Sequence, residues 1–127
     1  MKSIEHYMTS SPRTINSDQS LKFALSTMRE HNIRHLPVLE ANHPIGMLSE
    51  RDIRFLESFE KVDLSELKVK EACTDDPYTV ELNTPVKNVA REMARRKISS
   101  AMIVENGKLK GIFTWIDALN VLANLPE

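Results

Sequence analysis

Two copies of one short polar motif carry the residues whose types and spacing could do chemistry. Residues 46–52 read Gly-x-x-Ser-x-x-Asp, and residues 111–117 read Gly-x-x-Thr-x-x-Asp. A glycine that ends a strand lets a backbone or a ligand approach closely, and the start of the following helix favours an anion. An aspartate one turn into that helix lies on the same side, where its carboxylate can accept two hydrogen bonds from a vicinal diol such as ribose. The motif therefore predicts two related small-molecule sites.

A structural interpretation of the same residues stays open. Ser49 and Thr114 are good helix N-caps, and Asp52 and Asp117 would be favourable in the first turn of a helix whatever they bind. Caps are duplicated together with the fold that needs them, so the repetition of the motif favours a binding site without excluding this alternative.

The motif recurs because the whole chain repeats itself without a gap at an offset of 65 residues, as from Ser49 to Thr114. Pro12–Ile15 recurs as Pro77–Val80, and Ile33 recurs as Ile98. A repeat of this length is one supersecondary unit used twice. We predict a single module over residues 1–127. Within it, the first copy covers 8–60, a linker covers 61–71 and the second copy covers 72–124.

Each copy is predicted to form a strand, a helix, two strands and a final helix, which gives an α/β (α+β) chain. Apolar residues at i, i+3, i+4 and i+7 predict helices at about 18–32 and 85–97. We expect Ser17 or Asp18 to cap the first and Thr84 the second. Asn106-Gly107 between two apolar runs is a strong hairpin signal. Final helices are expected at about 50–60 and 115–125.

Composition excludes several classes of protein. The chain has 127 residues, which favours one compact domain, and its net charge of −1 argues against a polynucleotide or an anionic membrane as partner. Its single cysteine, Cys73, cannot form a disulfide within the chain. We see no signal peptide, no membrane span and no His or Cys spacing typical of a metal site, and we expect a cytoplasmic protein.

The first copy carries a family resemblance. Residues 33–39, Ile-Arg-His-Leu-Pro-Val-Leu, followed by residues 46–53, Gly-Met-Leu-Ser-Glu-Arg-Asp-Ile, closely resemble a bacterial CBS domain, named for cystathionine β-synthase. The whole chain resembles a stand-alone CBS pair, or Bateman module, over about 4–122. The second copy departs from the pattern, with Met102 where proline is usual and Ser99-Ser100 in place of Arg34-His35. This departure predicts unequal ligand affinity at the two sites.

The resemblance implies a fold and a ligand. The fold would be tandem CBS repeats, each a small mixed β-sheet with helices on one side, related by a pseudo-two-fold axis. The ligands would be adenosine derivatives, above all AMP, ADP or ATP, bound in clefts between the copies, with S-adenosylmethionine or NAD as alternatives. Each cleft would draw on both copies. One would combine Thr14, Ile15, Ile33, Arg34, His35, Thr114 and Asp117. The other would combine Thr79, Val80, Ile98, Ser99, Ser100, Ser49 and Asp52.

Arg51 is a further candidate, because its planar guanidinium could reach a phosphate. The equivalent residue is Ile116, so a phosphate contact of this kind would occur in one site only. The alternative is that Arg51 is an ordinary surface arginine on a helix.

The function implied is regulatory and not catalytic. The chain would sense an adenine nucleotide, form a homodimer through its helices, and act on an enzyme or transporter in trans. No nucleophile–base pair or phosphate-binding loop is apparent in the sequence. The alternatives are a dimerisation or interaction scaffold that binds no ligand, an enzyme, and a polynucleotide-binding module, the last disfavoured by the charge.

Overall fold

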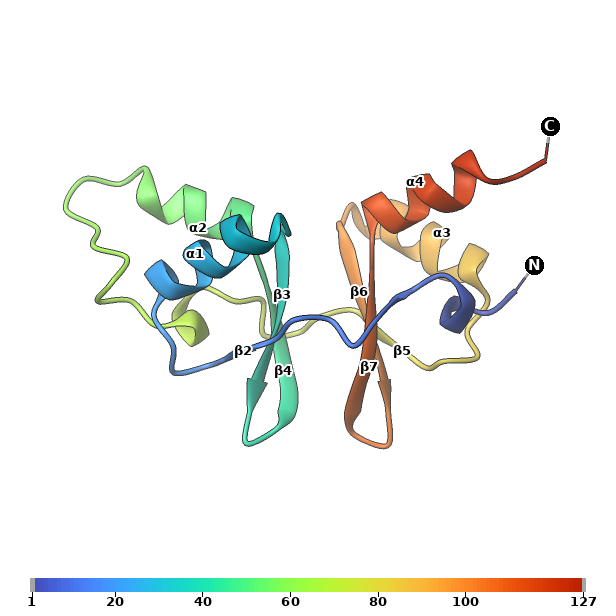
Figure 1. Ribbon diagram of the computed structural model, residues 1–127, viewed down its shortest axis with the longest axis horizontal. Helices are drawn as coiled ribbons and strands as arrows, with labels where there is room; N and C mark the ends of the chain where they lie inside the picture. The colour runs from blue at the N-terminus through green and yellow to red at the C-terminus, as the bar shows by residue number, and fades with distance from the viewer. Residues whose placement is uncertain (1, 127) are drawn as a thin grey trace. The chain divides into compact units, whose positions relative to one another are not determined.

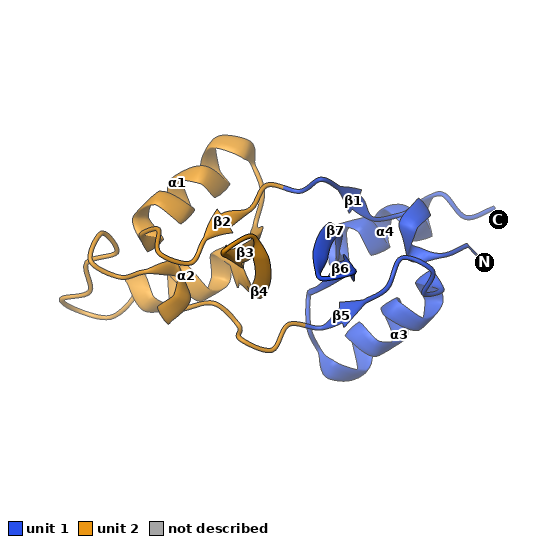
Figure 2. Ribbon diagram, turned by 90° about the horizontal axis from the view of Figure 1, so that it is seen from below, with its two compact units in different colours: residues 1–12, 78–127 blue, residues 13–77 orange. Residues whose placement is uncertain are grey.

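The computed structural model describes residues 2–126, and it divides into two compact units. Unit 1 combines the residues up to Pro12 with those from Tyr78 onward, and unit 2 runs from Arg13 to Pro77 (Figure 2). Each unit has a small sheet and two α-helices (Figure 1). The predicted order of strand, helix, two strands and helix is confirmed in both copies.

Unit 2 contains a three-stranded mixed sheet of order β2-β3-β4. Strand β2 pairs in parallel with β3, and β3 pairs antiparallel with β4. Helix α1 packs against both α2 and β3. The bounds are β2 (Ile15–Asn16), α1 (Leu21–His31), β3 (His35–Glu40), β4 (His43–Ser49), α2 (Glu50–Glu57) and the 3-10 helix η2 (Val69–Glu71).

Unit 1 repeats this arrangement and adds an edge strand, so that its sheet has the order β1-β7-β6-β5. Strand β5 pairs in parallel with β6, as β2 does with β3. Helix α3 packs against β6, and α4 packs against β7. The bounds are η1 (Ile4–His6), β1 (Thr9–Ser10), β5 (Thr79–Val80), α3 (Val86–Arg96), β6 (Ser100–Glu105), β7 (Lys108–Thr114) and α4 (Trp115–Ala123).

The units exchange the segments that precede each copy. In unit 1, Ile4 is fully buried and its amide donates to the Thr84 carbonyl oxygen at 2.7 Å. In unit 2, Val69 is fully buried and its amide donates to the Gln19 carbonyl oxygen at 2.8 Å. Residues 61–71, predicted as a linker, therefore belong to the compact unit of the first copy. Burial of one apolar side chain joins each of these segments to the core of its unit.

Helices α1 and α3 follow the predicted apolar spacing but begin later than expected, at Leu21 and Val86. Leu21, Ala24, Leu25 and Met28 form the buried stripe of α1. The N-cap of α1 is Ser20, whose Oγ accepts from the Phe23 amide at 3.0 Å, so the prediction of Ser17 or Asp18 is wrong. In α3 the N-cap position is Pro85 and not Thr84. Ser17, Asp18 and Ser20, of similar capping strength, all lie within the four positions before α1, and propensity does not decide among them.

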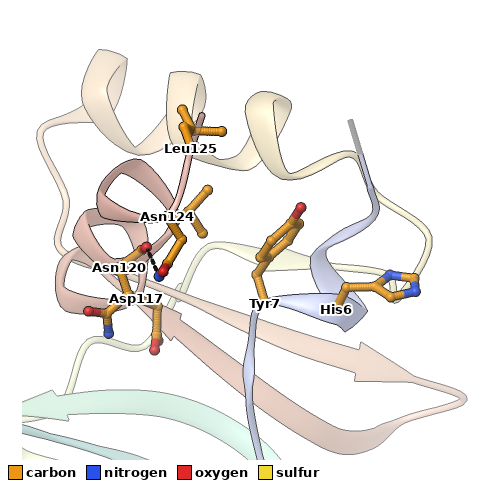
Figure 3. A pocket seen from close by; sticks show the side chains of 7 residues that line it. His6, Tyr7, Asp117, Asn120, Asn124 and Leu125 are labelled. Carbon is orange, nitrogen blue, oxygen red and sulfur yellow. Dashed lines mark hydrogen bonds between the residues drawn. The ribbon is translucent and has the colours of Figure 1, made fainter. Parts of the chain in front are cut away.

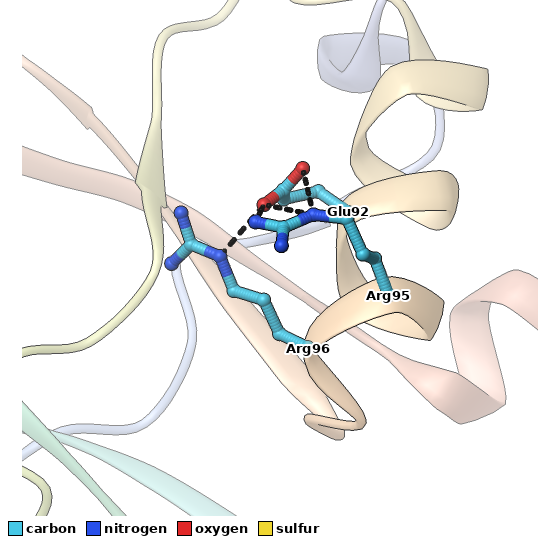
Figure 4. A network of polar contacts seen from close by, with 3 residues as sticks. All are labelled: Glu92, Arg95 and Arg96. Carbon is cyan, nitrogen blue, oxygen red and sulfur yellow. Dashed lines mark hydrogen bonds and ion pairs between the residues drawn. The ribbon is translucent and has the colours of Figure 1, made fainter.

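A polar network on α3 ties the last turn of this helix to the start of β5. Glu92 accepts hydrogen bonds from Arg95 and from Arg96, the latter with 2.8 Å between Nε and Oε1 (Figure 4). The Arg96 guanidinium also lies 4.7 Å from the centre of the Tyr78 ring, a cation–π distance. The hydrogen bonds from Arg95 and Arg96 lower the pKa of Glu92 to about 2, so this carboxylate stays ionised at physiological pH.

In the part of the chain that the structure describes, no helix has both the length and the apolar character that crossing a bilayer would require.

Candidate functional site

The repeated motif lies at the junction of a strand and a helix in both units, as predicted. In unit 2, Ser49 ends β4 and Asp52 lies in the first turn of α2. The Asp52 amide donates to Ser49 Oγ at 3.1 Å, and the Ser49 amide donates to Asp52 Oδ2 at 3.2 Å. This reciprocal pair is a capping box. The structural interpretation of Ser49 is therefore confirmed, and the carboxylate of Asp52 uses its Oδ2 atom for this cap.

Asp117 of unit 1 is held more firmly than Asp52. The Thr114 amide donates to Asp117 Oδ2 at 2.9 Å, which again joins the end of the strand to the first turn of the helix. The hydroxyl of Thr9, on β1, donates to Asp117 Oδ1 at 3.1 Å. Thr9 thus joins the candidate site, although it lies outside the motif. The offset of 65 relates it to Thr74, whose backbone pairs with Met47, so the repeat was a signal for a threonine beside the motif.

The motif glycines admit a crossing backbone rather than a ligand. A Cβ on Gly111 would lie 2.7 Å from the Thr9 carbonyl oxygen, and one on Gly46 would clash with the Thr74 carbonyl oxygen. Each glycine therefore lets the segment before the other copy lie directly against the last strand of its hairpin. This close approach is what brings Thr9 within hydrogen-bond reach of Asp117.

The residues before each hairpin also meet the motif of their own unit. In unit 2, His35 lies opposite Ser49 in the β3–β4 ladder, and the Glu50 amide donates to the Arg34 carbonyl oxygen at 2.9 Å. In unit 1, Ser100 lies opposite Thr114, and the Trp115 amide donates to the Ser99 carbonyl oxygen at 3.1 Å. The His35 ring is buried, whereas Arg34 and Ser99 are exposed. Ile33 is partly buried against the core of unit 2, and Ile98 is 36% exposed.

The short first strand of each copy lies beside the hairpin. Ile15 pairs with Val38, and Thr79 pairs with Met102. The Ile15 side chain is buried in the core of unit 2, and Val80 packs against the core of unit 1. The threonines Thr14 and Thr79 are exposed. Of these four candidates, the two threonines are exposed, Val80 is half-buried and Ile15 is buried.

The resemblance groups residues of unit 2 with Thr114 and Asp117, which belong to unit 1, and groups residues of unit 1 with Ser49, Arg51 and Asp52, which belong to unit 2. Within a unit, the structure brings the motif together with the residues before its own hairpin. The crossed grouping stays a prediction.

Each unit has a cavity that includes the motif aspartate. The cavity of unit 1 has a volume of about 260 Å³ and lies between α4 and the turn that follows η1 (Figure 3). The cavity of unit 2 has a volume of about 340 Å³ and lies between α2 and η2. The first is lined by His6, Tyr7, Asp117, Asn120, Val121, Asn124 and Leu125. The second is lined by Arg51, Asp52, Phe55, Leu56, Glu71 and Ala72.

The two cavities are related by the repeat but differ in chemistry. Asn120 corresponds to Phe55 and Tyr7 to Ala72 at the offset of 65. The wall of the unit 1 cavity is therefore polar where that of unit 2 is apolar. These residues lie outside the motif, which covers only the first turn of the final helix. Extending the repeat along the final helix and into the preceding turn would have found them.

The comparisons with known proteins agree with this geometry. The model of the CBS domain matches residues 4–57 and again residues 69–124. The CBS domain-containing protein YhcV of Bacillus subtilis is 29% identical over 125 residues, which cover 98% of this chain and 89% of YhcV. An inosine-5'-monophosphate dehydrogenase of Korarchaeum cryptofilum is 32% identical over 118 residues, but the match spans 92% of this chain and only 24% of the dehydrogenase.

Among solved structures, that of CBSX2 in complex with AMP superposes with a TM-score of 0.89 at 22% identity and covers 100% of both chains. This likeness concerns the fold. Two small mixed sheets with their helices, a repeated Ser/Thr-x-x-Asp motif and two matches to one family model lead to one conclusion: the chain belongs to the CBS domain family and contains two CBS domains.

Proposed function

We propose that the chain is a non-catalytic regulatory module that binds adenosine derivatives, with Asp52 and Asp117 holding the ribose. The observation that supports this proposal is that each motif aspartate lines a cavity of its own unit. A carboxylate at the edge of a cavity can accept hydrogen bonds from both hydroxyls of a ribose diol. The capping role of Ser49 is compatible with it, since this cap uses Oδ2, one of the two oxygens of the Asp52 carboxylate.

The ligands we propose are AMP, ADP and ATP, with S-adenosylmethionine and NAD as alternatives. The CBSX2 structure contains AMP, which makes AMP the first compound to test. Arg51 lines the cavity of unit 2 together with Asp52, a position from which a guanidinium can meet a phosphate. The competing proposal is a scaffold that binds no nucleotide, and a binding measurement separates the two.

Adenosine, AMP, ADP, ATP, NAD and S-adenosylmethionine should be titrated into the protein during thermal unfolding. A ligand present at about 100 times its dissociation constant stabilises the folded state by roughly 2.7 kcal/mol. For a domain of this size that corresponds to a rise in Tm of several degrees. If none of the six compounds raises the Tm at millimolar concentration, the proposal is wrong and the scaffold alternative is favoured. Guanosine and GMP serve as controls for unspecific effects.

Regulation would follow from a difference in affinity. A ligand shifts the protein between two conformations only by as much as its binding free energy differs between them. The conformation favoured by the nucleotide would then be recognised by an enzyme or transporter in trans. We propose the cytoplasm as the compartment, where adenine nucleotides are the abundant ligands of this class.

We also propose that the chain forms a homodimer through its final helices. Helix α4 has no buried residue, and its apolar side chains Trp115, Ile116, Leu119 and Leu122 are 45 to 64% exposed. On α2 and just after it, Phe55 and Phe59 are 64% and 51% exposed. Exposed apolar side chains that cluster on one helix, as on α4, mark interaction surfaces.

Replacing Leu119 and Leu122 together with lysine is expected to abolish the dimer, because two charges would be buried without partners in an apolar interface. Sedimentation should show wild-type protein at twice the mass of one chain and the double variant at the monomer mass. The matched control is Phe23→Lys, which changes an apolar residue that is 52% exposed on α1 and should stay dimeric. A monomeric wild-type protein would contradict the proposal.

A further inference from the structure

Five of the seven side chains that line the cavity of unit 1 can form hydrogen bonds, and Val121 and Leu125 add an apolar part. Asp117, Asn120 and Asn124 follow one another at the spacing of helical turns along α4 and its C-cap, and Tyr7 stands opposite them (Figure 3). The side-chain amide of Asn124 donates to the Asn120 carbonyl oxygen at 2.7 Å, which fixes its orientation. Its Oδ1 is an acceptor that this bond does not use. The cavity therefore continues from the proposed ribose site along a polar wall.

This wall carries acceptors and no strong cation. Its lining includes neither lysine nor arginine, and His6 is its only basic side chain. Where unit 2 has Arg51 in its cavity, unit 1 has Ile116, which is 48% exposed. A phosphate in this cavity would lie close to the Asp117 carboxylate without a guanidinium to compensate its charge. A ligand group that donates hydrogen bonds, above all a cationic one, matches this wall better than a phosphate does.

We infer that the cavity of unit 1 is a specificity subsite for adenosine derivatives whose 5' substituent is a phosphate-free hydrogen-bond donor, with a protonated amine as the best match. The inference rests on the proposed function, because it takes Asp117 as the ribose ligand. It assigns a distinct role to Asn120, Asn124 and Tyr7. The cavity of unit 2, with Arg51, is the one that accepts a phosphate.

The test weakens the Asp52 site, so that binding at the unit 1 site dominates the measurement. In an Asp52→Asn background, adenosine, AMP and 5'-amino-5'-deoxyadenosine are titrated by calorimetry. The amine is expected to bind on the order of tenfold more tightly than AMP, because a charge-assisted hydrogen bond is gained with one ligand and a repulsion with the other. Adding Ile116→Arg, which supplies the cation that unit 2 has, should reverse this order.

A second pair of variants assigns the effect to the wall. The double variant Asn120→Ala, Asn124→Ala should lose the preference for the amine, so that the ratio of the affinities for the amine and for AMP falls toward one. Both asparagines are exposed, so the fold is expected to survive, which thermal unfolding would verify. The matched control is Asn88→Ala, an exposed asparagine on α3, which should retain the preference.

The outcomes separate the two proposals. If adenosine itself fails to bind to the wild-type protein, the proposed function is wrong and the subsite falls with it. If adenosine binds but AMP binds as tightly as the amine or more tightly, the subsite alone is overturned. In that case Arg34→Ala should remove the AMP preference, as the crossed grouping of Arg34 with Asp117 predicts. An unchanged preference in the double asparagine variant also overturns the subsite.

Discussion

Asp117→Asn should weaken adenosine binding on the order of 10–100-fold at one site, and Asp52→Asn should do the same at the other. An asparagine amide presents one acceptor oxygen where the carboxylate presents two. A hydrogen bond to a charged group contributes about 1.5–3 kcal/mol, which sets the expected loss of affinity. Calorimetry with adenosine should show two classes of site in the wild-type protein and one unaffected class in each variant.

The two variants are expected to change ligand binding and not folding, because the capping hydrogen bonds of the aspartates are kept. Asparagine can still accept from the Ser49 or Thr114 amide, so the start of each helix is preserved. The matched control is Asp18→Asn, which changes an aspartate whose side chain is 66% exposed and pairs with Lys70. If adenosine affinity is unchanged in both motif variants, the aspartates are structural only.

Phe113→Ala is expected to lower the free energy of unfolding by about 3–5 kcal/mol, the range for removing a buried aromatic side chain. Phe113 is fully buried in the core of unit 1, where Ile4 and Val89 belong to the same cluster. The residue just before it, Ile112, pairs with Thr9 on β1, so a cavity here would also loosen the segment that reaches Asp117. Urea unfolding followed by circular dichroism measures the change.

The control for this variant removes the same side chain from the surface. Phe23 is 52% exposed on α1, and Phe23→Ala should change the free energy of unfolding by no more than about 0.5 kcal/mol. Equal unfolding midpoints for Phe113→Ala and the wild-type protein would show that Phe113 is not a core residue. A loss of adenosine affinity at the Asp117 site in Phe113→Ala, measured under folding conditions, would connect the core to the site.

The sequence by itself determined the repeat, the order of elements and the place of the motif. These features depend on local signals: the apolar spacing that buries Leu21 and Met28, the Asn106-Gly107 turn, and a Ser/Thr-x-x-Asp that favours the start of a helix. Because each signal acts over a few residues, its outcome is largely independent of the rest of the chain. The sequence also predicted that Ser49 could cap the helix that follows it, and the structure confirms this cap.

Tertiary structure alone decided what each copy is joined to and what lies beside its aspartate. Ile4 and Val69 are apolar residues in polar segments, and no local pattern says which of two similar cores will bury them. The Thr9–Asp117 hydrogen bond joins residues 108 positions apart and exists because β1 lies against Gly111. Pairing over such a distance depends on how the whole sheet and core pack, because many weak contacts add up there. The two residues that form the hydrogen bond do not determine it by themselves.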